Sequence, residues 1–247
     1  MLWEQKYTID GETRFSGTWG DIGTSSFYPP HHMTMGEGGC VYTNDAKLNR
    51  LIKSFRDWGR DCVCPSGHDN ICGHRFDGQF GELPQGYDHK YVYSHLGYNL
   101  KVTDLQAAVG VEQLKKFPSF IEARRHNWDR LRKALEPVAD KLILPEPAEN
   151  SEPSWFGFIV SVKEESGLTR NAVTRYIEDH NIQTRLLFSG NIIKHPCFDQ
   201  IRGTEAYRVV GDLEQTDFIM NHSFWVGVYP GMTDEKIDYM AQISRRL

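Results

Sequence analysis

The sequence predicts a layered α/β protein, and three observations lead to that prediction. Short runs of alternating apolar and small residues, typical of buried strands, are separated by segments with apolar residues at helical spacing. Of the 247 residues, 39% are hydrophobic and 25% charged, an ordinary globular composition that suits one large domain or two modest ones. A Pro- and Glu-containing stretch at 145–153 is typical of a linker. We expect a smaller α/β unit after it.

The first half alternates short strands and helices. Glycine-closed strand patterns occupy 17–23, 25–28 and 36–43. Asn44 or Asp45 can cap a helix, whose apolar stripe is Leu48, Leu51, Ile52 and Phe55. Two further helices are expected, one over 103–114 with Thr103 as its cap and one over 120–135.

The half that follows the linker repeats the alternation. Strands are predicted at 155–162, 182–188 and 223–230, and helices at 169–177 and from Thr233 onward. The helix at 120–135 carries a basic run: Arg124, Arg125, Arg130, Arg132 and Lys133. Because acidic residues are interleaved with it, we interpret this run as a solvated helix face rather than a site for an anionic partner.

Charge and hydropathy exclude several classes of protein. The net charge of −5 argues against a nucleic-acid partner bound by bulk electrostatics. No apolar run approaches the roughly 20 residues that span a bilayer, and the first residues carry no signal-peptide pattern. We therefore expect a cytoplasmic protein with no membrane partner.

Three of the five cysteines fall in one irregular stretch, about 58–91, that has no sustained hydrophobic period. Cys62, Cys64 and Cys72 form a Cys-x-Cys-x7-Cys run, which suits zinc or an iron–sulfur cluster. Either centre normally takes four protein ligands, so one more is needed; open candidates are Cys40, Cys197, His68, His74 or a group outside this chain. The alternative is three unrelated buried thiols.

A second candidate site lies in the turn that follows the strand at 25–28. Ser26 and nearby backbone amides could hold a phosphate, and His31 could act as a general base because imidazole in water changes charge near operating pH. Composition alone favours an ordinary turn with a surface histidine pair.

The motif around this turn resembles a family signature. Ser26-Phe27, then His31, then Gly36-Glu37-Gly38-Gly39 is similar to the Ser-Phe-x3-Lys-x4-Gly-Glu-Gly-Gly signature of the DegT/DnrJ/EryC1/StrS sugar aminotransferases. The segments Gly17–Ile22, Leu96–Asn99 and Thr103–Ala108 match the same family. The resemblance covers essentially the whole chain and implies a fold-type I pyridoxal phosphate (PLP)-dependent transferase, similar to aspartate aminotransferase.

Two departures from the aminotransferases agree with each other. His31 replaces the lysine that forms the Schiff base, and imidazole can move a proton but cannot form that bond. The cysteine run matches the iron–sulfur branch of the family, whose members are CDP-4-dehydro-6-deoxyglucose 3-dehydrases. This resemblance implies pyridoxamine 5′-phosphate (PMP), a [2Fe–2S] cluster on Cys62, Cys64 and Cys72, and loss of the C3 hydroxyl of a CDP-4-keto-6-deoxyhexose during 3,6-dideoxyhexose synthesis for lipopolysaccharide O-antigen.

The resemblance also implies site residues and partners. His31 would be the base at the cofactor, and Ser26 and Asn99 would contact the cofactor phosphate, Asn99 across a homodimer. An NADH-dependent flavin and iron–sulfur reductase would supply electrons. Arg185 could pair with the nucleotide diphosphate, and Asn191 is expected beside it at the substrate. Cys40 and Cys197 do not match the family's fourth ligand and are expected to be ordinary buried thiols.

Aligned with the family, residues 1–116 would be the remainder of the large cofactor domain and 117–247 the small domain. The family's first cluster cysteine and the aspartate at the pyridine nitrogen would precede Leu2, so we expect a C-terminal portion that is inactive alone. Two alternatives are a zinc-stabilised aminotransferase relative without redox function and a non-catalytic interaction piece.

Overall fold

The computed structural model describes residues 5–247, and the chain divides into two compact units, Met1–Lys115 and Lys116–Leu247. The boundary falls inside the helix α2, which runs from Asp104 to Leu135. Among the described residues, no helix is long and apolar enough to cross a membrane.

The first unit begins with a hairpin that our sequence analysis did not predict. Strand β1 (Lys6–Ile9) pairs antiparallel with β2 (Glu12–Phe15), and Ile9 lies opposite Glu12. The two-residue turn is Asp10-Gly11, with φ of 50° and 82°. Asp-Gly is a preferred turn for two positive φ values, so the signal was present in the sequence.

A second antiparallel pair, β3 (Gly23–Ser26) and β4 (Gly39–Tyr42), sets Ser26 opposite Gly39. Helix α1 (Ala46–Arg56) follows, and the Asp45 carboxylate accepts the N–H groups of Lys47 and Leu48 at 2.7 and 2.9 Å, as predicted for a cap. The expected apolar stripe is not buried within this unit, since Leu51 and Phe55 are 48% and 46% exposed.

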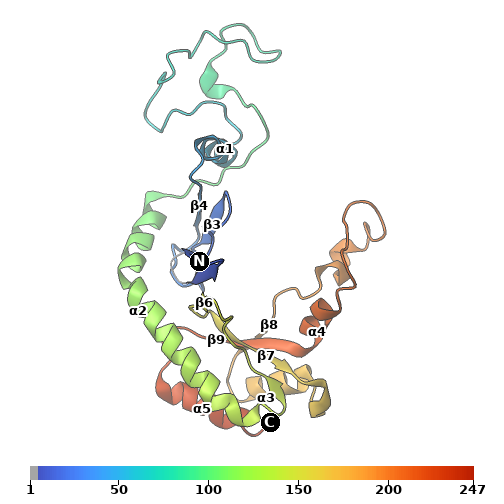
Figure 1. Ribbon diagram of the computed structural model, residues 1–247. Helices are drawn as coiled ribbons and strands as arrows, with labels where there is room; N and C mark the ends of the chain where they lie inside the picture. Colours follow the sequence, from blue (N-terminus) through green and yellow to red (C-terminus); the bar gives the residue numbers. More distant parts are fainter. Residues whose placement is uncertain (1–4) are drawn as a thin grey trace. The chain divides into compact units, whose positions relative to one another are not determined.

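The long segment between α1 and α2 contains only one short helical turn, a 3-10 turn at His89–Tyr91 (Figure 1). Its two ends pair irregularly: the Asp61 N–H donates to Val92 O at 3.0 Å, the Ser94 N–H to Gly59 O at 2.9 Å, and an isolated bridge joins Asp57 to Asn99. These contacts close the segment into a loop that we call the thiol loop, residues 57–99, because it carries Cys62, Cys64 and Cys72.

Helix α2 corrects our prediction of two helices. Thr103 and Gln106 cap its start reciprocally: Gln106 Oε1 accepts the Thr103 N–H at 2.8 Å, and Thr103 Oγ1 accepts the Gln106 N–H at 3.3 Å. The helix then continues through Pro118 to Leu135. A proline removes one helical hydrogen bond; the buried side chains of Trp128, Leu131 and Leu135 anchor the turns that follow it.

The second unit is built on an antiparallel sheet of order β5-β7-β9-β8. Its strands are β5 (Leu142–Ile143), β7 (Gly157–Val162), β9 (Ser223–Gly227) and β8 (Thr184–Leu186); a further short strand, β6, spans Ser151–Glu152. Phe158 of β7 lies opposite Val226, and Val160 opposite Phe224, so these two central strands bury the same face.

Three helices complete this unit: α3 (Arg170–Asp179), α4 (Glu214–His222) and α5 (Asp234–Ser244). Thr169 and Thr233 cap α3 and α5 as predicted, each accepting a backbone N–H. Side chains of α2, α3 and α5, among them Leu131, Ile177 and Ile237, form one hydrophobic core with the buried face of the sheet.

The basic run on α2 is not simply a solvated face. Arg124 is 3% exposed, and its Nη1 donates to the carbonyls of Trp155, at 3.1 Å, and Val228. The Arg125 Nε donates to Pro153 O at 3.0 Å. The prediction was wrong for Arg124, because the guanidinium satisfies backbone carbonyls inside the unit.

Candidate functional site

The turn after β3 is closed by backbone hydrogen bonds. The Phe27 N–H donates to Gly38 O at 2.8 Å, and the Met35 N–H donates to Phe27 O at 3.0 Å. Ser26 Oγ accepts the Tyr28 N–H at 3.3 Å, and Ser26 is exposed at the end of its strand. Gly39 is required here because a Cβ would lie 2.7 Å from the Ser25 carbonyl oxygen. The serine hydroxyl is therefore presented at a fixed strand end.

His31 lies in this turn. The His31 backbone N–H donates to Tyr28 O at 2.9 Å, and the His31 ring meets the Tyr28 ring edge-on with centroids 5.5 Å apart. The neighbouring His32 is 7% exposed, so the pair is not the surface histidine pair that composition alone favours. The start of α2 supports the turn, because Gln106 Nε2 donates to Glu37 O at 3.0 Å.

Asn99 lies at the end of the thiol loop. The flanking residues bond to the last turn of α1, with the Tyr98 N–H donating to Phe55 O at 2.7 Å and the Leu100 N–H to Arg56 O at 3.0 Å. Asn99 is exposed. The neighbouring hydrogen bonds thus fix the backbone at Asn99, and the residue itself stays accessible to solvent.

The structure brings the three clustered cysteines together. Cys62, Cys64 and Cys72 line one small hollow in the thiol loop, and His89 lines it with them. We call this the thiol hollow. Burial is the main cause that raises the pKa of the Cys62 thiol, and the nearby Cys64 and Cys72 sulfurs add to it. Cys72 is exposed, whereas Cys62 and Cys64 are half-buried. The pKa of the Cys72 thiol is lowered.

His89 connects Cys72 to an acidic partner. His89 Nδ1 lies 3.9 Å from Cys72 Sγ, and His89 Nε2 lies 2.6 Å from Asp61 Oδ2. The His74 backbone N–H, 3.4 Å from the same sulfur, lowers the Cys72 thiol pKa, with a second contribution from His89. The pKa of His89 is raised, first by Asp61 and then by Cys72. Carboxylate, imidazole and sulfur thus form a line.

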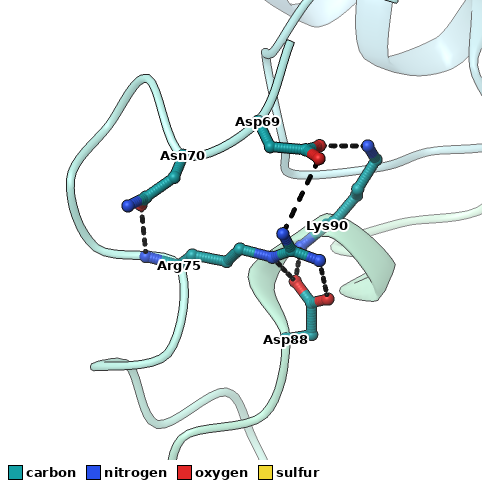
Figure 2. Close-up of polar contacts among 5 residues, drawn as sticks. All are labelled: Asp69, Asn70, Arg75, Asp88 and Lys90. Atoms are coloured by element: carbon teal, nitrogen blue, oxygen red, sulfur yellow. Dashed lines mark hydrogen bonds and ion pairs between the residues drawn. The ribbon is translucent and has the colours of Figure 1, made fainter. Parts of the chain in front are cut away.

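A cluster of ion pairs holds the loop around the thiol hollow (Figure 2). The Arg75 guanidinium forms a two-pronged contact with Asp88, at 2.9 and 2.6 Å, and lies 3.7 Å from Asp69, which also pairs with Lys90. Asn70 Oδ1 accepts the Arg75 N–H at 3.1 Å. The hydrogen bonds from Arg75 lower the pKa of the Asp88 carboxyl to about 2. We call these five residues the ion clamp.

The thiol hollow gathers metal-binding residue types without forming a complete metal site. Among residues 5–247, no group of three or more His, Cys, Asp or Glu side chains is arranged to hold a metal ion. Of the fourth-ligand candidates, Cys40, His68 and His74 do not line the hollow. His74 is instead paired with Asp77, its ring nitrogen 3.3 Å from the carboxylate. The donor set fits a thiolate centre that needs a further ligand.

The remaining two cysteines differ from our prediction. Cys40 in β4 and Cys197 in a 3-10 turn are exposed thiols, not buried ones. Cys40 lies opposite Ser25, which is itself buried, so the exposure is at the β4 side of this pair.

The two predicted substrate residues belong to the second unit. Arg185 in β8 is exposed, and its Nη1 donates to the Thr184 carbonyl at 2.8 Å. Asn191 is 3% exposed, and its Nδ2 donates to Asp217 Oδ1 at 2.7 Å. Arg185 is presented to solvent, whereas Asn191 is already engaged inside the unit. Their roles in substrate binding stay predictions.

Our sequence analysis missed His89, Asp61 and the ion clamp. The pairs Arg75–Asp88, Asp69–Lys90 and Asp61–His89 span 13, 21 and 28 positions in a segment with no periodicity. One local signal existed: Asp88 caps the 3-10 turn by accepting the Lys90 N–H at 3.0 Å, which makes Asp88-His89-Lys90 a structured end to the loop.

Solved structures with the same fold place the chain in a class. It superposes on an Escherichia coli GDP-4-keto-6-deoxy-D-mannose-3-dehydratase with bound hydrated PLP at a TM-score of 0.77 and 27% identity, covering 96% of this chain and 57% of that chain. A GDP-4-keto-6-deoxymannose-3-dehydratase with a trapped PLP-glutamate geminal diamine gives 0.76, also at 27% identity, with 96% and 57% covered. The fold is that of the aminotransferase-like PLP-dependent proteins, as the sequence predicted.

The family follows from the sequence match. The model of the DegT/DnrJ/EryC1/StrS aminotransferase family matches residues 7–244, and the chain belongs to this family. It is 54% identical to the lipopolysaccharide biosynthesis protein RfbH of Salmonella typhimurium, over 93% of this chain and 52% of the relative. It is 53% identical to a dTDP-4-dehydro-2,6-dideoxy-D-glucose 3-dehydratase of Saccharopolyspora spinosa, over 93% and 48%. The chain spans about half the length of these relatives.

Proposed function

We propose that this chain carries part of the machinery of a PMP-dependent 3-dehydrase, which removes the C3 hydroxyl of a CDP-4-keto-6-deoxyhexose in 3,6-dideoxyhexose biosynthesis. One observation carries the proposal: three thiols share one hollow in the unit that also contains His31. The motif that the sequence resembles has a lysine at the position of His31. The relatives named as 3-dehydratases support the reaction class.

In this proposal the first unit holds the cofactor through groups at fixed strand and loop ends. Ser26, presented at the end of β3, and Asn99, at the end of the thiol loop, would contact the PMP phosphate. When bound, PMP supplies the amine that condenses with the sugar 4-ketone. His31 would take a proton at the cofactor methylene carbon, since imidazole side chains commonly serve as general bases.

The thiol hollow would hold the redox centre. Cys62, Cys64 and Cys72 are the ligand type that [2Fe–2S] clusters use, and a fourth ligand would come from outside the hollow. The cluster would supply single electrons, received from an NADH-dependent flavin and iron–sulfur reductase. Replacing a C–OH bond by C–H is a two-electron reduction, which explains the need for such a partner.

The substrate and assembly are further parts of the proposal. Arg185, exposed on β8, would pair with the diphosphate of the CDP-sugar, because a guanidinium fork matches phosphate oxygens. If Asn99 contacts the phosphate of the cofactor bound to a second subunit, the protein is a homodimer. The expected location is the cytoplasm, where nucleotide sugars and NADH are available.

Iron loading tests the redox centre. The chain, together with a polypeptide that supplies the part of the relatives that it does not cover, is reconstituted anaerobically with iron and sulfide. We expect Cys72→Ser to abolish the visible absorbance of the cluster, while Cys197→Ser, which changes an exposed thiol outside the hollow, leaves it intact. Zinc without iron in the purified protein, or an unchanged spectrum in Cys72→Ser, would contradict the proposal.

Proton transfer tests the role of His31. In the same reconstituted assembly, His31→Asn should still bind PMP, but it should lose exchange of the cofactor methylene proton with deuterated solvent by a factor of about 10²–10⁴. His32→Asn, one residue away on a buried side chain, serves as the control for damage to the turn. Equal exchange rates in the two variants would remove His31 from the mechanism.

A further inference from the structure

The thiol hollow contains one side chain that neither the cysteine run nor the family signature points to. His89 lines the hollow beside the three cysteines. Its side chain is 15% exposed, although it lies in a loop where most residues face solvent. The two ring nitrogens of a largely buried imidazole need hydrogen-bond partners. Three side chains contact the His89 ring: Asp61, Cys72 and Phe80.

Each partner fixes a different part of the ring. Asp61 Oδ2 holds Nε2 at 2.6 Å, and the Phe80 ring stacks on one face, with centroids 5.2 Å apart and planes within 2°. The remaining nitrogen, Nδ1, faces Cys72 Sγ at 3.9 Å. The ring therefore cannot rotate without losing a contact, and its free edge points at one sulfur.

The arrangement matches the outer shell of a metal centre. Groups that hydrogen-bond to metal ligands orient them and tune their basicity, and a carboxylate behind the imidazole fixes the ring. A carboxylate, an imidazole and a thiol in line also describe a cysteine nucleophile. Two further thiols in the same hollow favour the metal centre, because a nucleophile does not need them.

We propose that His89, held by Asp61 and Phe80, is the positioning residue of the thiol hollow, and that the contact between its Nδ1 and the Cys72 sulfur sets how that sulfur binds a metal centre. This inference rests on the proposed function, because it takes the thiol hollow as the site of a thiolate-bound metal.

The experiment uses Co²⁺ alone as the probe, added to the full 247-residue chain with reduced thiols. A single Co²⁺ ion can complete its coordination with water, so it reports on the three thiols without needing a fourth protein ligand. Thiolate-to-cobalt charge-transfer absorbance gives both an affinity and a band energy. The variants are His89→Leu, His89→Asn, Asp61→Asn and the control His74→Asn, whose ring is paired with Asp77 outside the hollow.

We expect His89→Leu to weaken Co²⁺ binding by about 10-fold or more, the usual effect of removing an outer-shell partner. Its band should move to longer wavelength, because a sulfur without a hydrogen bond gives up charge more easily. His89→Asn retains an N–H donor near the Nδ1 position, so it should keep part of the affinity. Asp61→Asn should fall between wild type and His89→Leu, and His74→Asn should match wild type.

Two results would overturn the inference, and they are distinguishable. If wild type shows the charge-transfer band and His89→Leu matches it in affinity and band energy, the positioning role is wrong while the thiolate centre stands. If wild type shows no such band, the thiolate centre of the proposed function fails and the inference fails with it. Far-ultraviolet circular dichroism identifies a variant that is unfolded, and His89→Asn then decides the outcome through its band energy.

Discussion

The core of the second unit and the thiol loop of the first are stabilised in opposite ways. The core buries apolar side chains from three helices and a sheet, with Phe158 and Ile237 fully inaccessible. In the thiol loop, which the structure describes in full, the one buried hydrophobic side chain is that of Val92. Its shape instead depends on hydrogen bonds and on the ion clamp around Arg75 (Figure 2).

The difference shows which kind of order suits a hollow lined by thiols. Apolar packing contributes most to the free energy of unfolding, but it leaves no polar surface to meet a metal or its ligands. A loop held by charged groups can present three thiols and an imidazole in one hollow. Such a loop opens more easily, and its stability depends on pH and salt more strongly than apolar packing does.

The largest expected effect is on the core. Leu131→Ala removes most of a side chain that is 1% exposed, and it should lower the free energy of unfolding by about 2–5 kcal/mol. Urea unfolding followed by circular dichroism measures this loss. Leu186→Ala, at a position 47% exposed in the same unit, should change stability by about 0.5 kcal/mol or less. Equal losses in the two variants would mean that burial does not separate them.

Acid should open the thiol loop before it disturbs the core. The pKa of Asp88 is about 2 in the folded loop, below the value of about 3.9 for an unfolded Asp. A depressed carboxyl pKa stabilises the fold fully above the unfolded value, and that stabilisation is lost as pH falls from about 4 through 2. Pulsed hydrogen exchange should show several-fold faster exchange of amides 69–92 over this window.

Asp88→Asn provides the control for that experiment. It removes the titrating group, so exchange in 69–92 should already be faster at pH 6 and should change less between pH 4 and 2. Unchanged protection of these amides in wild type at pH 2 would show that the ion clamp does not hold the loop.

The helix caps give a smaller and more local comparison. Asp45 accepts two N–H groups at the start of α1, so Asp45→Ala should cost about 1 kcal/mol. Thr233 accepts one N–H at 3.4 Å at the start of α5, so Thr233→Ala should cost less. Hydrogen exchange of the first-turn amides of each helix measures both. A larger loss at Thr233 would mean that packing, not the cap, decides where these helices begin.

Much of the fold was predictable from local signals. Asp45, Thr169 and Thr233 are caps followed by helical periodicity, and the structure confirms all three. Helix α4 was missed because it has no such signal: Leu213 precedes it with a φ of 62° and no side-chain cap. The continuous helix α2 was missed because Pro118 normally ends a helix, and only tertiary packing shows that this one continues.

The candidate site was predictable in its chemistry and not in its geometry. The spacing of Cys62, Cys64 and Cys72 indicated a shared site, and the structure brings the three into one hollow. His89 could not be found this way, because its contacts with Asp61 and Cys72 span 28 and 17 positions. Hydrogen bonds of that range leave no periodic trace in a sequence; only the folded loop reveals them.

Gln106 joins two tasks in one carboxamide. Its oxygen accepts the Thr103 N–H that begins α2, and its nitrogen donates to the Glu37 carbonyl in the turn that carries His31. A carboxylate can accept a hydrogen bond but cannot donate one. Gln106→Glu would therefore keep the helix start and release the turn. Faster amide exchange confined to 27–38 would register that uncoupling. The orientation of a single amide thus ties the beginning of α2 to the turn that carries His31.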